Sequence, residues 1–226
     1  YFYPASTVKL PIALFAIEKL NENKHLSIDT PFMLEDDTLK TTMRKELEKI
    51  FVLSDNQANN RLFEFLGQDY INQKFISKGL NESRIFHRLS TKNSSNLNGK
   101  RVDFFLNDSI ISFQNKSIKP AKLNLKELKK GIGYINHAGS LIKEPMNFSG
   151  KNFISINDLH KIIKILFFSD KFEESHRFNL TKKQKDLVFE YMSGYPKEFG
   201  YDENDYPYYF NKFFIYGDKE LGVSNS

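Results

Sequence analysis

The sequence contains no cysteine and no tryptophan, and it has no long hydrophobic run. Without cysteine, the chain cannot form disulfides, thiolate zinc sites or a cysteine nucleophile. The longest apolar stretch, residues 10–17, lies between Lys9 and Glu18 and is too short to cross a bilayer. We therefore expect no transmembrane segment in these 226 residues. Residue 1 is Tyr rather than Met, so the absence of a visible targeting segment excludes nothing.

Charge and composition narrow the class of protein further. The chain carries 33 basic and 28 acidic side chains, and its lysines are interspersed with Asp and Glu rather than gathered in one region. This distribution does not indicate a nucleic-acid partner. The five histidines share no ligand spacing, so no metal site is expected. With 40% hydrophobic and 15% aromatic residues, the chain is long enough for one domain with a substantial core.

Hydrophobic periodicity predicts six helices and two extended segments. The first helix is apolar nearly all round from Val8 to Leu20, which is typical of a helix that its neighbours bury on most sides. The other helices each show an apolar stripe or a clear stop signal. We expect them at residues 41–53, 57–66, 69–78, 156–168 and 180–192, and we expect the extended segments at residues 102–113 (with a turn at Asn107-Asp108) and 134–143.

A serine and a lysine three residues apart stand at the start of the first helix. In Ser6-Thr7-Val8-Lys9, the i, i+3 spacing places the Ser6 hydroxyl and the Lys9 amine on one face. A serine hydroxyl needs an adjacent base to become a nucleophile, and a shielded lysine can lose its charge and take that proton. Backbone N–H groups at the helix start could hold an oxyanion. The alternative is a plain helix cap at Ser6 and a solvent-reaching surface lysine at Lys9.

A second motif, Ser54-Asp55-Asn56, falls at the break between two predicted helices. Here Ser54 could relay a proton between Lys9 and a leaving group, and the Asn56 amide could hold a substrate carbonyl. The alternative is that the motif is simply a helix cap. Another Ser-x-x-Lys sequence begins at Ser140, but Glu144-Pro145 follows it and no helix is expected there.

Together the two motifs resemble those of class A β-lactamases and DD-peptidases, and most closely the β-lactamase-related serine hydrolases of Bacteroidetes-type bacteria. The resemblance rests on residues 3–11 (YPASTVKLP) and 52–62 (VLSDNQANNRL), with weaker likeness at 144–148 and 152–159. It implies an α/β fold. It also implies that Ser6 is the acylated nucleophile, Lys9 its base, Ser54 the proton relay and Asn56 a substrate-binding group, while Asp55 has a structural role.

The resemblance further implies a substrate that is either a β-lactam or a peptidoglycan-like amide, a periplasmic or cell-surface location, and no metal or organic cofactor. Two departures from the family pattern bear on the expected activity. The sequence contains no Lys-Thr-Gly triplet, and the region 80–101 offers only Glu82, without the Glu-x-x-Leu-Asn pattern of the deacylating base. An acyl-enzyme lacking that base would turn over slowly, so we do not expect an efficient β-lactamase.

We therefore expect residues 1–226 to form a single serine β-lactamase-like domain that holds mostly the helical lobe, with flanking N-terminal and C-terminal sheet strands absent. The expected function is a serine hydrolase that forms an acyl-enzyme at Ser6. The alternative from another class is a non-catalytic cell-envelope binding or scaffold protein that retains the fold. The two motifs together favour the hydrolase.

Overall fold

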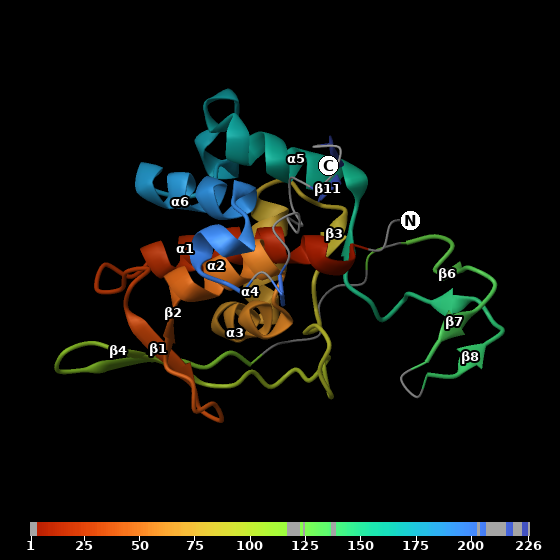
Figure 1. Cartoon of the computed structure of the whole chain (residues 1–226), viewed down its shortest axis with the longest axis horizontal. Helices are drawn as coiled ribbons and strands as arrows, with labels where there is room; N and C mark the ends of the chain where they lie inside the picture. Colours follow the sequence, from red (N-terminus) through yellow and green to blue (C-terminus); the bar gives the residue numbers. More distant parts are fainter. Residues whose placement is uncertain are drawn as a thin grey trace.

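The computed structural model describes residues 4–116, 123, 125–136, 139–202, 204–206, 216–218 and 223–225. In these residues helices form the body of the molecule, and short antiparallel strands lie at its edges (Figure 1). The α-helices are α1 Lys9–Asn21, α2 Met43–Leu53, α3 Asn56–Leu66, α4 Gln68–Ser77, α5 Ile156–Phe167 and α6 Lys182–Ser193; the 3-10 helices are η1 Ala5–Val8, η2 Ser169–Lys171, η3 Glu174–His176 and η4 Pro196–Phe199. The strands are β1 Pro31–Leu34, β2 Thr41–Thr42, β3 Ser83–Arg84, β4 Val102–Phe105, β5 Ile110–Phe113, β6 Lys129–Lys130, β7 Tyr134–Ile135, β8 Leu141–Ile142, β9 Met146–Asn147, β10 Phe153–Ile154, β11 Tyr216–Asp218 and β12 Val223–Asn225.

Helix α1 runs through the centre of the helical body (Figure 1). Its sequence is apolar on nearly every side, and α2, α3 and α4 all lie against it. Every residue from Lys9 to Glu18 is buried, including the lysine and the glutamate. Glu18 pairs with Lys78 at 2.9 Å, which ties α1 to the end of α4. In the part of the chain that the structure describes, each helix is too short or too polar to cross a membrane.

An antiparallel sheet of four strands, in the order β2-β1-β4-β5, covers one side of α3. Burial alternates along β1 and β4, so one face of this sheet packs into the core and the other faces solvent. On the inner face Phe32 lies opposite Phe104, and the Phe104 ring contacts both Phe65 of α3 and Phe113 of β5 at centroid distances of 5.1 and 5.7 Å. This aromatic cluster fixes the sheet against α3, which begins at Asn56, the last residue of the second motif.

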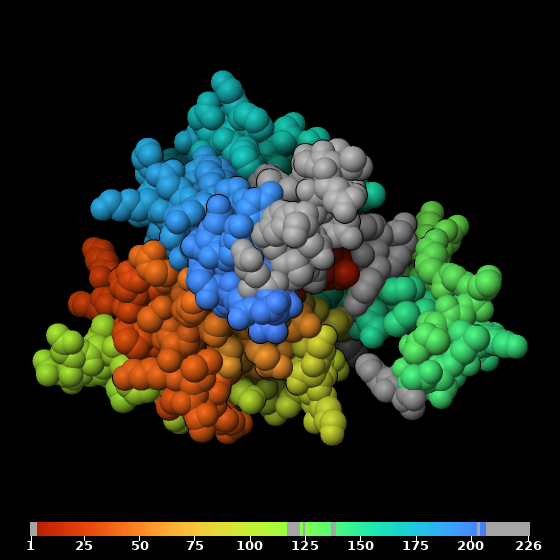
Figure 2. Space-filling view, viewed as in Figure 1, coloured from red at the N-terminus to blue at the C-terminus, as the bar shows by residue number. Residues whose placement is uncertain are grey.

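Residues 125–151 form a separate arm built from two small ladders, β6 with β9 and β7 with β8. The arm (green) projects away from the helical body in Figures 1 and 2. Among the described residues between 106 and 151, none is buried, and Ile132 is 96% exposed. The arm therefore adds no hydrophobic core of its own.

The structure confirms the six predicted helices and shifts their ends by one or two residues. The first helix begins as a 3-10 turn, η1, and continues as α1. Thr41 and Thr42 belong to β2 rather than to a helix, because they pair with β1. The two extended segments are hairpins: β4 and β5 turn at Asn107-Asp108 as predicted, and the region 134–143 contains β7 and β8. Ser140 precedes β8 and lies on no helix, also as predicted.

Candidate active site

Ser6 lies in the 3-10 turn that leads directly into α1. The residue before it, Ala5, has φ of 42°, a left-handed conformation that is uncommon for a residue other than glycine and is often found at functional sites. The Ser6 side chain is half-buried, and the N-cap positions of η1 and α1 are held by Pro4 and Val8 rather than by Ser6. Its Oγ lies 3.3 Å from Nζ of Lys9, as the i, i+3 spacing predicts. The capping role considered for Ser6 is therefore absent.

Lys9 is completely buried, with 0% of its surface exposed, so it is not a surface lysine that reaches solvent. Burial of an amine without hydrogen-bond partners would be costly, and here Ser54 supplies two. Lys9 Nζ donates to the Ser54 backbone carbonyl at 2.5 Å and lies 2.9 Å from Ser54 Oγ. The two motifs, 45 residues apart in the sequence, thus meet at one buried nitrogen.

Ser54 can offer both atoms to Lys9 because of its backbone conformation. It ends α2 with φ 54° and ψ 42°, in the left-handed region. Most side chains disfavour this region, so the conformation needs support from the surrounding structure. The support comes from the helices on either side, since α2 ends at Leu53 and α3 begins at Asn56, two residues later. The break between the helices therefore aims Ser54 at the start of α1.

Asp55 and Asn56 make different contacts. Asp55 is the N-cap of α3, where its carboxylate accepts a hydrogen bond from the Ala58 N–H at 2.7 Å. The capping interpretation of this motif therefore holds for Asp55, whereas the Ser54 side chain contacts Lys9 instead. Asn56 is half-buried, and its Nδ2 donates to Ser90 Oγ at 3.0 Å.

The described hydrogen bonds of Lys9 connect its amine to two serines. A carbonyl oxygen can only accept, so one N–H of Lys9 must point at the Ser54 carbonyl. Ser6 Oγ and Ser54 Oγ both lie within hydrogen-bond distance of the same nitrogen, at 3.3 and 2.9 Å. The arrangement can therefore pass a proton from Ser6 to Lys9 and on to Ser54 without moving any heavy atom by more than ordinary hydrogen-bond adjustments.

Ser90 was not predicted from the sequence as a site residue. It comes from the polar segment 88–101, which lies along one face of α3 and reaches Asn56 across 34 residues of sequence. Loop composition alone does not indicate such a contact. The only local signal is the spacing of polar residues on α3, where Asn56, Asn60 and Glu64 recur every four residues and so share one helix face.

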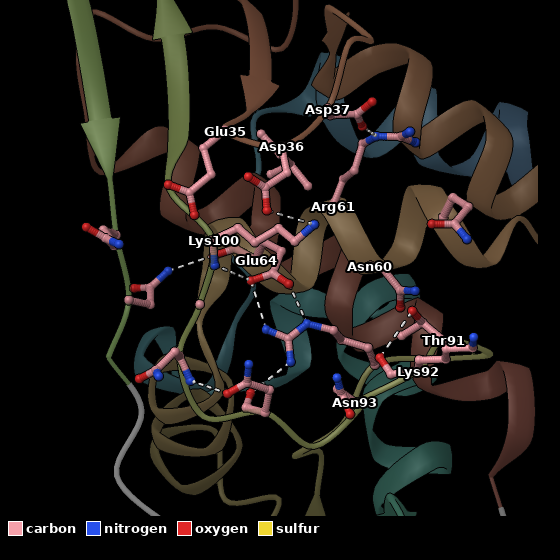
Figure 3. A pocket seen from close by; sticks show the side chains of 18 of the residues that line it. Glu35, Asp36, Asp37, Asn60, Arg61, Glu64, Thr91, Lys92, Asn93 and Lys100 are labelled. Carbon is pink, nitrogen blue, oxygen red and sulfur yellow. Dashed lines mark hydrogen bonds and ion pairs between the residues drawn. The ribbon is translucent and has the colours of Figure 1, made fainter.

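A polar pocket of about 970 Å³ lies between α3 and the facing segment (Figure 3). Its lining includes Asn60 and Glu64 of α3, Thr91 and Lys92 of the facing segment, and carboxylates that follow β1. Ser6, Lys9 and Ser54 are not among its lining residues. The pocket therefore lies beside the candidate site rather than around its serine and lysine.

Glu82 is the only glutamate in the region 80–101, and it takes no part in the described contacts of Ser6, Lys9 and Ser54. The Glu82 side chain is exposed, and its backbone N–H donates to Asp158 at 2.9 Å. Glu64, although buried, has one carboxylate oxygen in hydrogen bonds with both Arg88 and the Lys100 N–H. The described residues bring together no group of three or more histidine, aspartate or glutamate side chains that could hold a metal ion.

Comparison with protein-family models matches residues 1–110 to the Beta-lactamase enzyme family. The matched segment contains Ser6, Lys9 and the whole of the Ser54–Asn56 motif. Searches among curated proteins and solved structures gave no significant match. The mixture of helices and small antiparallel sheets agrees with the expected α/β, β-lactamase-like fold. The match over residues 1–110 supports a serine hydrolase of the β-lactamase fold.

Proposed function

We propose that this protein is a serine hydrolase that forms an acyl-enzyme at Ser6, with Lys9 as its base. The observation that carries the proposal is the buried amine of Lys9, which lies within hydrogen-bond distance of both Ser6 Oγ and Ser54 Oγ. An amine shielded from water disfavours its charged form, and a neutral amine can accept the Ser6 proton. The family match over residues 1–110 supports the same chemistry.

In the proposed reaction, Ser6 Oγ forms a bond to the substrate carbonyl carbon while its proton passes to Lys9 Nζ. Backbone N–H groups near Ser6 stabilise the negative charge on the carbonyl oxygen. When the tetrahedral intermediate collapses, the carbon–nitrogen bond of the amide or lactam breaks. The leaving nitrogen takes its proton from Ser54 Oγ, which is reprotonated by Lys9. The products of this half-reaction are an ester at Ser6 and a free amine, with Lys9 neutral again.

The substrate that we propose is a β-lactam or a peptidoglycan-like amide, bound in part through the amide of Asn56. Hydrolysis of the ester requires a water molecule whose proton is removed by a base, and the region 80–101 lacks the glutamate pattern that supplies this base in efficient β-lactamases. We therefore propose slow deacylation, as in a penicillin-binding enzyme. Members of the family are typically secreted, and we place this protein in the periplasm or at the cell surface.

The test is incubation of the full chain with a penicillin-type probe, with intact mass followed over time. We expect one slowly cleared adduct, located at Ser6 by peptide mapping. Ser6→Ala should abolish it, whereas the matched control Ser140→Ala should not, because Ser140 belongs to the second Ser-x-x-Lys sequence and lies on no helix. Labelling that persists in Ser6→Ala would disprove the nucleophile. Absence of any adduct would favour the non-catalytic binding protein.

A further inference from the structure

We propose that Ser90 is a positioning residue that orients the amide of Asn56 toward the substrate. The inference rests on the proposed function, because Asn56 matters for catalysis only if it binds the acylating substrate. Ser90 is exposed, and its Oγ lies 3.0 Å from Asn56 Nδ2. Its backbone has φ of 48°, a strained conformation for serine that turns the residue out of the path of its segment.

The conformation of Ser90 is held by its neighbour Leu89, which is fixed to α3 on both sides of its peptide unit. The Asn60 side chain donates to the Leu89 carbonyl at 2.8 Å and accepts from the Leu89 N–H at 2.8 Å. Asn60 is one helical turn after Asn56, so the two amides point from the same face of α3. The contact at Leu89 therefore sets the position along α3 at which Ser90 meets Asn56.

One turn further along α3, the same pattern recurs with charged groups. Glu64 is 3% exposed and forms a two-pronged ion pair with Arg88, which is 8% exposed. Arg88 also donates to the backbone carbonyls of Ser94 and Asn96, at 3.3 and 2.9 Å. Three residues of α3, spaced by four, thus hold three consecutive residues of the facing segment. The two segments run in opposite directions, so the pairs are Glu64 with Arg88, Asn60 with Leu89 and Asn56 with Ser90.

The hydroxyl of Ser90 decides how the Asn56 amide presents itself. An asparagine amide has two N–H donors and one carbonyl acceptor, and free rotation would interchange their directions. A hydrogen bond from Nδ2 to Ser90 Oγ occupies one donor and so fixes the direction of the other donor and of Oδ1. Without the Ser90 hydroxyl, the substrate would have to hold the amide in place itself. The loss should therefore fall on substrate binding.

The test compares Ser90→Gly with the wild type in the penicillin-probe reaction. Glycine accepts the positive φ more readily than serine, so the fold should be kept while the hydroxyl is lost. The rate of adduct formation is measured over a range of probe concentrations. We expect the half-saturating concentration to rise about 3- to 10-fold, the scale of one hydrogen bond. The limiting rate and the final amount of adduct should not change, whereas a merely structural defect would reduce the amount.

Two further variants make the result specific. Asn93→Gly removes a side chain from the same segment at a similar φ of 53° and should behave like the wild type. In an Asn56→Ala background, Ser90→Gly should have no further effect, because it acts through Asn56. Three outcomes would overturn this inference while leaving the proposed function standing. Ser90→Gly could leave the half-saturating concentration unchanged, or Asn93→Gly could raise it by as much as Ser90→Gly does. Ser90→Gly could also raise it equally in the Asn56→Ala background. A wild type that forms no adduct would instead overturn the proposed function, and this inference with it.

Discussion

Replacement of Arg88 by methionine should destabilise the protein strongly, because it leaves a buried carboxylate without its cation. The Arg88 guanidinium pairs with both oxygens of Glu64, which is 3% exposed, and its remaining donor reaches two backbone carbonyls. Methionine fills a similar volume and can still pack on Phe63, whose ring the guanidinium now covers at 5.1 Å. The loss of stability therefore comes from lost charge pairing and hydrogen bonds more than from a cavity.

The expected magnitude follows from what remains around Glu64. After the substitution, the carboxylate keeps the hydrogen bond from the Lys100 N–H at 2.8 Å and loses its cation. Removing one partner of a buried pair typically costs about 3–5 kcal/mol in the free energy of unfolding. For a domain stable by roughly 5–15 kcal/mol, that is a large fraction. Arg88→Lys should lose less, because it keeps the charge but not the two-pronged geometry.

Urea unfolding, followed by circular dichroism, measures these differences. Arg88→Met should lower the urea midpoint by about 1–3 M. The double variant Glu64→Met/Arg88→Met should recover most of the loss, since no unpaired charge is left. As a matched control, Arg101→Met removes an exposed arginine that pairs with the less exposed Asp103, and it should change stability by less than about 1 kcal/mol. A loss below about 1 kcal/mol in Arg88→Met, or a double variant no more stable than it, would refute the reasoning.

Two more predictions concern a cap and a buried amine. Asp55→Ala and Thr181→Ala each remove a helix N-cap, and each should lower the free energy of unfolding by about 1 kcal/mol, measured by urea unfolding. Only Asp55→Ala should also slow acylation of Ser6, because it loosens the turn that holds Ser54. Equal acylation rates in the two variants would contradict this. Burial lowers the pKa of Lys19 from 10.5 to about 8, so the folded protein releases this proton before the unfolded chain does. The difference in the free energy of unfolding between the wild type and Lys19→Met should therefore shift in favour of the wild type as the pH rises from 8 to 10.5, by up to about 3 kcal/mol. A difference that stays flat or falls over this pH range would contradict the prediction.

The helices and the pairing of Ser6 with Lys9 could be predicted because both depend on near neighbours in the sequence. Apolar periodicity marks α1 as buried, and the i, i+3 spacing alone brings Oγ and Nζ within 3.3 Å. The N-caps at Thr181 and Asp55 are likewise local, since each side chain bonds a backbone N–H three residues on. Local rules suffice wherever the partner lies within one helical turn.

The contacts that complete the candidate site could not be predicted, because their partners are far apart in sequence. Strand β1 is four residues long and exists as a strand by pairing with β4, about 70 residues later. The contact between Asn56 and Ser90 spans 34 residues and depends on Leu89 and Arg88 being fixed to α3 first. A loop rich in serine and asparagine has many possible conformations, and only its tertiary partners select one.

Two lysines in the helical body, Lys9 and Lys78, are buried and have different partners. Lys9 is fully buried, and the partners of its Nζ include the hydroxyl oxygens of Ser6 and Ser54 and the Ser54 carbonyl oxygen. The buried Lys78, by contrast, pairs directly with a carboxylate, that of Glu18. A carboxylate beside an amine favours its charged form, whereas hydroxyl and carbonyl partners permit a neutral one. Lys9 thus has two serine hydroxyls within hydrogen-bond distance, as the proposed proton transfer requires, whereas Lys78 joins the end of α4 to α1 through Glu18.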